Sequence, residues 1–265
     1  MNNKNNKKKN NTLQTLLENS NSRGMDVDDP RVTYARREII HSNAFLNSIY
    51  REWYGLIIEN LPAIKGEILE LGSGAGFINE VLADVITSEV FYCPFVDINA
   101  DGRFLPFADN SLRSIVMTDV FHHIPDVHEF LVDAQRTLKD SGRILMVEPW
   151  VSRWSQWVMD HFHSEPMDGE MQNWQFPTTG PLSGSNQALP WIVFERDREV
   201  YERDFPDLQV IKIRRFMPFR YLLSGGVSMR ALAPAWSNSF FEKIEGWLNA
   251  KRWAMFAFIV IEKKR

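Results

Sequence analysis

The feature that most constrains this chain is residues 67–77, where an apolar run ends in three glycines at alternate positions, Gly72, Gly74 and Gly76. The apolar run predicts a β-strand, and the residues that follow the glycines predict a helix. A glycine-rich turn between a strand and a helix exposes backbone amides and lets a ligand approach the main chain closely. Residues 67–77 therefore predict a cofactor site of the nucleotide type at the end of a strand.

The residues around these glycines narrow the kind of cofactor. A dinucleotide fingerprint needs its third glycine one residue later, where this chain has Phe77. Glu70 adds a carboxylate at the end of the strand, where it would repel a pyrophosphate but hold an ammonium group. The Gly-Lys-Ser/Thr sequence of a P-loop is absent here. A cofactor with a cationic end fits best, and a tight turn without any ligand remains the alternative.

The segment from Glu70 to Gly76 resembles motif I of the class I S-adenosylmethionine-dependent methyltransferases, in which the acidic residue faces the amino-acid end of the cofactor. The resemblance implies S-adenosyl-L-methionine as the cofactor. It also implies a first set of cofactor-binding residues, which are Glu70, Gly72, Ser73, Gly74 and Gly76.

The resemblance continues over about residues 64–149 and implies contacts for the adenosine part. Residues 101–111 are similar to the family segment after the third strand, in which an Asp receives the adenine amino group. Asp101 is therefore the implied adenine contact, with the backbone at Gly102 beside the ring. An acidic residue that ends the second strand binds the ribose hydroxyls in this family. Glu89 is the favoured match, and Asp97 is the alternative.

Residues 116–126 resemble the family motif at the methyl-donor end. The resemblance places Asp119 near the methionine part of the cofactor. His122 and His123 belong to the same pattern; we interpret them as structural, with a direct chemical role as the alternative. Glu148 ends the fifth predicted strand and is expected to face the place of an acceptor.

Strand-like runs alternate with helical stretches along the chain, which is typical of a parallel sheet covered on both faces. The predicted fold class is α/β, with a Rossmann-like, seven-stranded, mostly parallel sheet and helices on both faces. The strands are predicted at residues 68–71, 85–90, 96–100, 114–118, 143–147, 208–213 and 255–262. Helices are predicted at residues 33–61, 76–83, 127–138 and 242–249, and residues 91–95 are too few for a crossover helix.

Three segments differ in composition. Residues 1–11 contain only Met, Asn and Lys and are predicted to be disordered, because they cannot bury apolar surface. Residues 12–63 form an N-terminal helical extension that is expected to pack over the mouth of the cofactor site. Residues 64–265 form the methyltransferase domain, which carries an insertion at about residues 150–198 without long regular elements.

Charge and cysteine content exclude several classes of protein. The net charge is −4, and it becomes −8 without the four lysines of residues 1–11, which argues against a nucleic-acid partner. The single cysteine, Cys93, excludes an internal disulfide and fits a reducing compartment. No segment approaches the roughly 18 apolar residues of a membrane span. We therefore expect a cytoplasmic protein without a membrane span.

The insertion suggests the acceptor class. Its tryptophans alternate with hydroxyl and amide side chains, a combination that suits a sugar or glycolipid. These tryptophans are Trp150, Trp154, Trp157, Trp174 and Trp191. The whole chain also resembles bacterial class I methyltransferases associated with surface-polysaccharide synthesis. The prediction is O-methylation of a small-molecule, sugar or lipid-linked saccharide acceptor. The alternatives are N- or C-methylation of another metabolite and a non-catalytic, cofactor-binding partner subunit.

A hydroxyl acceptor needs a group that takes its proton as the methyl group is transferred. The candidates lie in the insertion and are His161, His163 and Glu165. Histidines and acids at this density could also hold a metal. Because the oxygen-rich ligand pattern of a magnesium site is not evident, no metal ligand is assigned.

Overall fold

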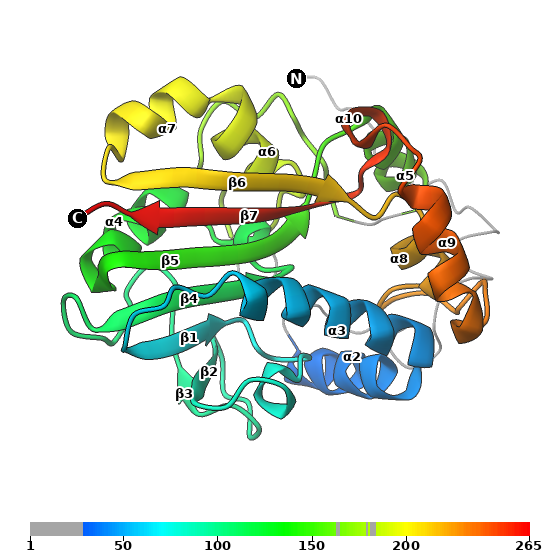
Figure 1. Cartoon of the computed structure of the whole chain (residues 1–265), viewed down its shortest axis with the longest axis horizontal. Helices are drawn as coiled ribbons and strands as arrows, with labels where there is room; N and C mark the ends of the chain where they lie inside the picture. Colours follow the sequence, from blue (N-terminus) through cyan, green and yellow to red (C-terminus); the bar gives the residue numbers. More distant parts are fainter. Residues whose placement is uncertain (1–28, 163–164, 179, 181–183) are drawn as a thin grey trace, which may run out of the picture.

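A computed structural model describes residues 29–162, 165–178, 180 and 184–265 of the chain. Within these residues a seven-stranded sheet forms the centre of the molecule, in the order β3-β2-β1-β4-β5-β7-β6 (Figure 1). The strands are β1 (Glu67–Leu71), β2 (Val85–Glu89), β3 (Ile98–Asn99), β4 (Leu112–Thr118), β5 (Leu138–Pro149), β6 (Leu208–Phe216) and β7 (Phe256–Lys263).

Strands β1 to β5 pair in parallel, and β7 runs antiparallel to both β5 and β6. This confirms the predicted mostly parallel α/β sheet. The central strand β4 shows why the fold is stable, because Ile115, Val116 and Met117 are fully buried on alternate faces of the sheet. A strand that is apolar on both faces needs helices on both sides.

One face of the sheet is covered by α2 (Pro30–Ser42) and α3 (Ala44–Glu59). The predicted single helix over residues 33–61 is therefore wrong in one respect, since two helices meet at Asn43. The side-chain oxygen of Asn43 accepts hydrogen bonds from the backbone N–H groups of Phe45 and Leu46, each at 3.1 Å. An N-cap of this kind starts a new helix in a new direction.

The opposite face is covered by α4 (Val127–Thr137), α7 (Arg198–Asp204), the short α6 (Leu189–Trp191) and the π-helical segment η3 (Ile192–Arg196). Helix α4 occupies the predicted place between β4 and β5. The Asp126 carboxylate accepts a hydrogen bond from the Glu129 N–H group at 3.0 Å and caps this helix, as its sequence predicts.

The predicted helix over residues 76–83 is wrong, because only the single 3₁₀ turn η1 (Ile78–Glu80) is present there. The glycine turn and the start of β2 leave too few residues for a longer helix. Phe77 is buried, and its ring packs edge-on against Tyr54 of α3 with ring centres 5.1 Å apart. Helix α3 therefore covers the surface that a helix after the glycine turn would have covered.

Several short helices gather beyond the carboxyl ends of β1, β4 and β5, at the right of Figure 1. They are α5 (Arg153–Phe162), α8 (Arg220–Ser224), η4 (Ala235–Ser237), α9 (Asn238–Glu245) and α10 (Ala250–Trp253). The insertion thus contains a ten-residue helix that its mixed composition did not predict. The helix expected at residues 242–249 begins four residues earlier, as α9.

Residues 90–97 contain no helix, which confirms the predicted absence of a crossover helix between β2 and β3. Among the helices of the described residues, none combines the length and the apolar character that a membrane crossing requires.

Candidate functional site

A cavity of about 430 Å³ lies at the carboxyl ends of β1, β2 and β4. Its volume is within the range of small-molecule sites. Parallel strands place their ends at a common edge, so residues that are far apart in sequence meet there. The predicted cofactor-binding residues that line the cavity are Glu70, Gly72, Ser73, Gly76, Glu89, Asp101, Gly102 and Asp119.

The glycines form the wall of the cavity where the chain passes closely beside other groups. Gly72 has a φ of +66°, and a Cβ atom there would lie 2.5 Å from Val120 Cγ2. A Cβ atom at Gly74, the remaining predicted residue, would collide with Glu89 Oε2. A Cβ atom at Gly76 would lie 2.5 Å from the Tyr54 hydroxyl oxygen. The glycine turn can therefore pack against Val120, Glu89 and Tyr54 only because side chains are absent.

Glu70 gives the cavity a buried carboxylate. Its residue is 2% exposed, and its Oε2 atom has no hydrogen-bond partner among the described residues. Burial raises the Glu70 pKa to about 7, partly offset by a hydrogen bond from Ser73, and the nearby Glu89 raises it further. An unpartnered anion that lines a cavity is suited to bind a cationic ligand group. The observed residues thus fit a cofactor with an ammonium group.

Glu89, rather than Asp97, faces the cavity. Glu89 Oε1 accepts a hydrogen bond from the Val90 N–H group at 2.9 Å, and burial raises the pKa of this carboxyl. Asp97 points elsewhere, because its Oδ2 atom accepts hydrogen bonds from the Thr87 N–H group at 2.8 Å and the Thr87 hydroxyl at 2.7 Å. Of the two residues weighed for a ribose contact, only Glu89 is in position.

Asp101 follows β3 in the chain and lines the same cavity as the glycine turn. Arg103 pairs with it, with 2.6 Å between Arg103 Nη2 and Asp101 Oδ2. The hydrogen bonds from Arg103 hold the Asp101 pKa below its ordinary value. Asp101 therefore stays ionised and fixed in place, so it acts as a hydrogen-bond acceptor.

Asp119 connects the large cavity to a second, smaller one of about 50 Å³. It follows β4 with a φ of +62°, an uncommon backbone conformation for a residue with a side chain. Burial raises the Asp119 pKa to about 6, His122 lowers it, and Glu148 and Glu165 raise it further. The smaller cavity is lined mainly by apolar side chains, including Met159, Met229 and Phe256.

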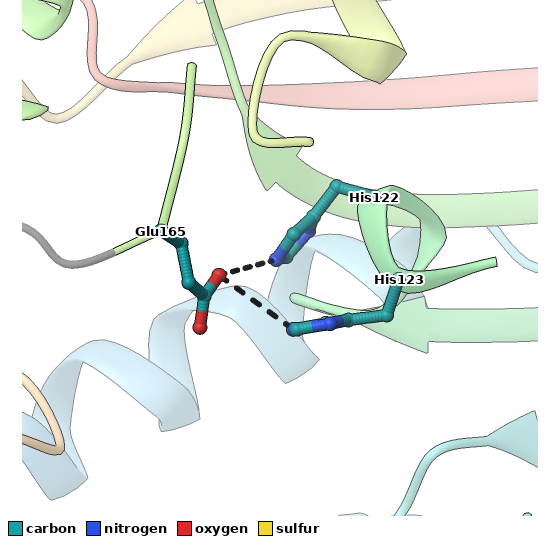
Figure 2. A group of neighbouring side chains, drawn as sticks. All are labelled: His122, His123 and Glu165. Carbon is teal, nitrogen blue, oxygen red and sulfur yellow. Dashed lines mark ion pairs between the residues drawn. The ribbon is translucent and has the colours of Figure 1, made fainter. Parts of the chain in front are cut away.

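Beside Asp119, His122 and His123 of the turn η2 (Phe121–His123) point toward Glu165 (Figure 2). Glu165 Oε2 lies 3.7 Å from His122 Nε2 and 3.8 Å from His123 Nε2. His123 also lines the large cavity. The sequence pointed to Glu165 but placed its partners in the insertion, whereas the partners come from the end of β4.

Glu148 does not face an acceptor, so that expectation is wrong. Its side chain is fully buried behind His122, with 2.8 Å between Glu148 Oε2 and His122 Nδ1. Glu148 Oε1 accepts hydrogen bonds from the N–H groups of Val120 and Phe121, each at 2.8 Å. Glu148 thus holds the turn η2 and the His122 ring in place, because both of its carboxylate oxygens are engaged by them.

The two histidines have opposite pKa shifts. Burial lowers the His122 pKa, but the hydrogen bond and charge of Glu148, with Asp119 and Glu165, raise it by more, so the His122 pKa lies above its ordinary value. Burial and the neighbouring positive charge of His122 lower the His123 pKa. His123 is therefore neutral at pH 7 and carries a free lone pair on one ring nitrogen.

The other candidates for catalysis are not in this group. His161 lies exposed on α5, with 2.7 Å between its Nδ1 atom and the Trp157 carbonyl oxygen, and it lines neither cavity. His163 lies outside the described residues.

Sequence reasoning expected the N-terminal helices to pack over the mouth of the cofactor site but named none of their cavity-lining residues. Thr33 and Arg36 of α2, with Tyr50 and Tyr54 of α3, line the large cavity. The tyrosines follow the apolar face of α3, which already indicated that this helix packs near the cofactor site.

The tryptophans of the insertion mostly serve packing. Among the residues that the structure describes, no tryptophan lines either cavity. Trp150 is 2% exposed, and the Trp174 ring N–H group donates a hydrogen bond to Asp197 at 2.9 Å. Stacking of a sugar on these rings therefore has no support from the walls of the described cavities.

Several solved structures are similar to this chain. One, from a complex of the Haloferax volcanii Trm112 methyltransferase activator with a putative methyltransferase, has a TM-score of 0.51 and 13% identity over 91% of this chain and 100% of that chain. Geranyl diphosphate C-methyltransferase from Streptomyces coelicolor A3(2), solved with Mg²⁺, geranyl diphosphate and S-adenosyl-L-homocysteine, has a TM-score of 0.48 and 11% identity, covering 94% and 89%. The YcgJ protein of Bacillus subtilis has a TM-score of 0.44 and 16% identity, covering 81% and 99%.

At 13% identity and a TM-score of 0.51, the first of these structures supports the fold alone. No curated protein matches the chain. The family described as "Methyltransferase domain" matches residues 14–188, which is more than half of the chain. The chain therefore belongs to the methyltransferase domain family, and it is an S-adenosylmethionine-dependent methyltransferase with an α/β, Rossmann-like fold.

Proposed function

We propose that this enzyme transfers a methyl group to a hydroxyl oxygen of a small-molecule acceptor. The observation that carries the proposal is the position of His123, a neutral imidazole that lines the cofactor cavity close to Asp119 and Glu165. A neutral amine is already nucleophilic, so methyl transfer to it depends less on a base than methyl transfer to a hydroxyl does. A hydroxyl must lose its proton as its oxygen gains the methyl group, and a positioned base assists this.

The described residues support a definite orientation of the cofactor. Glu70 would hold the ammonium group, the backbone of the glycine turn would lie beside the cofactor, and Asp119 would lie at the methyl-donor end. Glu89 would accept hydrogen bonds from the ribose hydroxyls, and Asp101 would accept one from the adenine amino group. The bound cofactor would supply a methyl group on a positively charged sulfur atom, which needs no further activation.

The acceptor would enter where the large and the small cavity meet, at Asp119. Holding it in line behind the methyl group is the main catalytic task, since correct placement removes much of the entropic barrier. Gln187 and Tyr221 supply polar groups to the smaller cavity, and Met159, Met229 and Phe256 supply apolar surface. This lining suits an acceptor with an apolar part beside its hydroxyl.

His123 would take the proton. As an oxygen lone pair of the acceptor formed the new carbon–oxygen bond, the methyl carbon–sulfur bond would break and leave its electron pair on sulfur, and the O–H proton would pass to the free ring nitrogen of His123. Glu165, 3.8 Å from His123 Nε2, would then stabilise the positive ring. His122 is not in position to do this, because its side chain is buried beside Glu148 and does not line the large cavity.

The test is methyl transfer by purified protein from labelled cofactor to a panel of alcohols, saccharides, lipid-linked saccharides and amines. His123→Asn should lower kcat by about 100-fold or more, the usual contribution of general base catalysis, and should leave the affinity for S-adenosyl-L-homocysteine unchanged. His128→Asn, at an exposed position on α4, is the matched control and should leave kcat unchanged. Full activity of His123→Asn, or label found only on nitrogen or carbon, would contradict the proposal.

The acceptor class is the finer part of this proposal. A sugar or lipid-linked saccharide is kept as the candidate class from the sequence resemblance, and the panel tests it directly. Tight binding of S-adenosyl-L-homocysteine with no label on any acceptor would instead favour a non-catalytic partner subunit. A cytoplasmic location likewise stays a prediction from the cysteine content.

A further inference from the structure

We propose that His122, His123 and Glu165 bind a divalent transition-metal ion, with zinc as the reference ion. Their ligand atoms all lie within 4.8 Å of one another. Two imidazoles and one carboxylate form a ligand set used by catalytic zinc sites and by other first-row metal sites. The sequence assigned no metal ligand and considered Glu165 only with His161 and His163, because His122 and His123 are more than forty residues from Glu165 in the chain.

The orientation of both rings favours metal binding. His122 Nδ1 lies 2.8 Å from Glu148 Oε2, and His123 Nδ1 lies 3.3 Å from the Gly184 carbonyl oxygen. Both partners can only accept hydrogen bonds, so each Nδ1 atom carries the proton. Each Nε2 atom, when neutral, then presents its lone pair toward Glu165 (Figure 2). A ligand histidine is commonly fixed by a carboxylate or carbonyl on its other nitrogen in this way.

Two of the distances require only small adjustments. Zinc bonds to nitrogen and oxygen are about 2.0–2.1 Å, which separates two ligand atoms of a tetrahedral site by about 3.4 Å. Glu165 Oε2 lies 3.7 Å from His122 Nε2 and 3.8 Å from His123 Nε2. These two separations would have to contract by a few tenths of an ångström. The third, between the two histidine nitrogens, is at most 4.8 Å and would have to close to the same value.

Gln187 occupies the space between these ligand atoms. Its Nε2 atom lies 3.1 Å from His122 Nε2 and 2.5 Å from Glu165 Oε2. A half-turn of the amide group would replace Nε2 by the oxygen atom Oε1 and so offer a fourth ligand. A small movement of Gln187 would alternatively leave that position for a water molecule or an acceptor oxygen.

The surrounding charges also favour a cation. Glu148, Asp119 and Glu165 all act on His122 as negative charges. The cluster is shielded from solvent, with 1% of the His122 side chain and 20% of the Glu165 side chain exposed. Magnesium is disfavoured, because it prefers oxygen ligands in an octahedral arrangement, whereas imidazole nitrogen suits zinc, iron, cobalt or nickel.

The ion would also act on the acceptor in the proposed reaction, and this part of the inference rests on the proposed function. His123 lines the cofactor cavity, so an open coordination position would face the place of the acceptor. With His123 Nε2 bound to the ion, a hydroxyl bound beside it would lose its proton to water more easily, so the ion would take over the role that His123 has in the metal-free enzyme. Binding of the ion itself does not depend on methyl transfer, so the two can be tested separately.

The first experiment measures zinc binding by the full-length protein after removal of metals with a chelator and dialysis. Isothermal titration should give one tight site per chain, and elemental analysis after gel filtration should give one zinc per chain. His123→Ala and Glu165→Gln should each weaken binding at least about tenfold, as loss of a ligand must exceed the effect of losing a supporting group. His128→Ala, an exposed histidine on α4, should bind zinc as the wild type does.

The second experiment uses cobalt(II), whose visible absorption reports coordination. An intense ligand-field band typical of four-coordinate cobalt should form in the wild type and in His128→Ala, and it should be lost in Glu165→Gln. Affinity for S-adenosyl-L-homocysteine, measured on the same samples, shows that the variants are folded. Absence of tight zinc binding by the wild type, or equal binding by Glu165→Gln, would overturn the proposal. Metal binding without methyl transfer would overturn only the proposed function.

Discussion

At the scale of single residues, Glu70 combines two opposing properties. Its carboxylate lines the cofactor cavity, yet its Oε2 atom has no hydrogen-bond partner in the described part of the chain. Burial raises the Glu70 pKa to about 7. The ionised Glu70 carboxylate therefore increases the affinity for a cationic ligand but lowers the free energy of unfolding of the ligand-free protein. Each effect can be measured.

The first prediction concerns ligand affinity. Glu70→Gln should weaken binding of S-adenosyl-L-homocysteine by about 1–3 kcal/mol at pH 8, because the ligand ammonium loses a charged partner. In the wild type the affinity should fall as the pH drops below about 7, since Glu70 must then release a proton before it can hold a cation. Isothermal titration between pH 6 and 8 measures both effects. A pH dependence that is the same in Glu70→Gln would show that another group controls binding.

The second prediction concerns stability without ligand. A carboxyl whose pKa is raised from 4.5 to about 7 on folding binds its proton more tightly in the folded state. The free energy of unfolding should therefore decrease as the pH rises from 4.5 to 7, by about 3 kcal/mol from this group. Urea unfolding of the wild type and Glu70→Gln should show a difference that grows in favour of Gln over this range. A difference that does not change with pH would contradict the burial of the charge.

At the scale of elements, Asn43 separates two helices that a periodic apolar pattern had joined. Its side-chain oxygen caps α3, and its Nδ2 atom donates a hydrogen bond to the Ser224 carbonyl oxygen at 2.8 Å. The residue thus fixes the angle between α2 and α3 and connects both to α8. Four cavity-lining residues lie on these two helices, so their angle shapes the cofactor site.

The third prediction follows from this cap. Asn43→Ala should lower the free energy of unfolding by about 1–2 kcal/mol, because two backbone N–H groups lose their partner. Glu38→Ala, at an exposed position on α2, is the control and should change it by less than about 0.5 kcal/mol. Urea unfolding of both variants makes the comparison. Equal effects would mean that Asn43 does not act as a cap.

The loss of the expected helix after the glycine turn has a similar physical cause. The pattern after Gly76 is compatible with a helix, but β2 begins at Val85 and leaves room for one 3₁₀ turn only. The N-terminal helix α3 then supplies the apolar cover, through Tyr54 against Phe77. Local periodicity cannot reveal this, because the covering element comes from a different part of the chain.

At the scale of the whole molecule, one ion-pair network joins the N-terminal helices to the segment before β7. Arg220 of α8 is 3% exposed and pairs with Glu52 of α3 and Glu245 of α9, each at 2.6 Å. Glu245 also accepts hydrogen bonds from the N–H groups of Phe219 and Arg220 at 2.8 Å. Arg220 therefore links three helices that lie near the carboxyl edge of the sheet.

The fourth prediction tests this link. Arg220→Met should lower the free energy of unfolding by about 3–5 kcal/mol, since it leaves the buried Glu245 carboxylate without a positive partner. Arg214→Met, an exposed arginine on β6, should change it by less than about 0.5 kcal/mol. Thermal and urea unfolding of both proteins provide the measurement. A small loss in Arg220→Met would show that the helices are held by apolar packing alone.

The sequence alone determined the α/β sheet and the glycine turn, because strand periodicity is a local feature. Its resemblance to the methyltransferase family indicated Glu70, Glu89, Asp101 and Asp119, and all four line the cavity. Only the tertiary structure decided that Glu148 supports His122 from behind, and that Glu165 meets His122 and His123 rather than a neighbour in the insertion. It also decided that the tryptophans of the insertion pack away from the described cavities. These outcomes depend on how segments far apart in the chain pack together, which no local pattern of residues specifies.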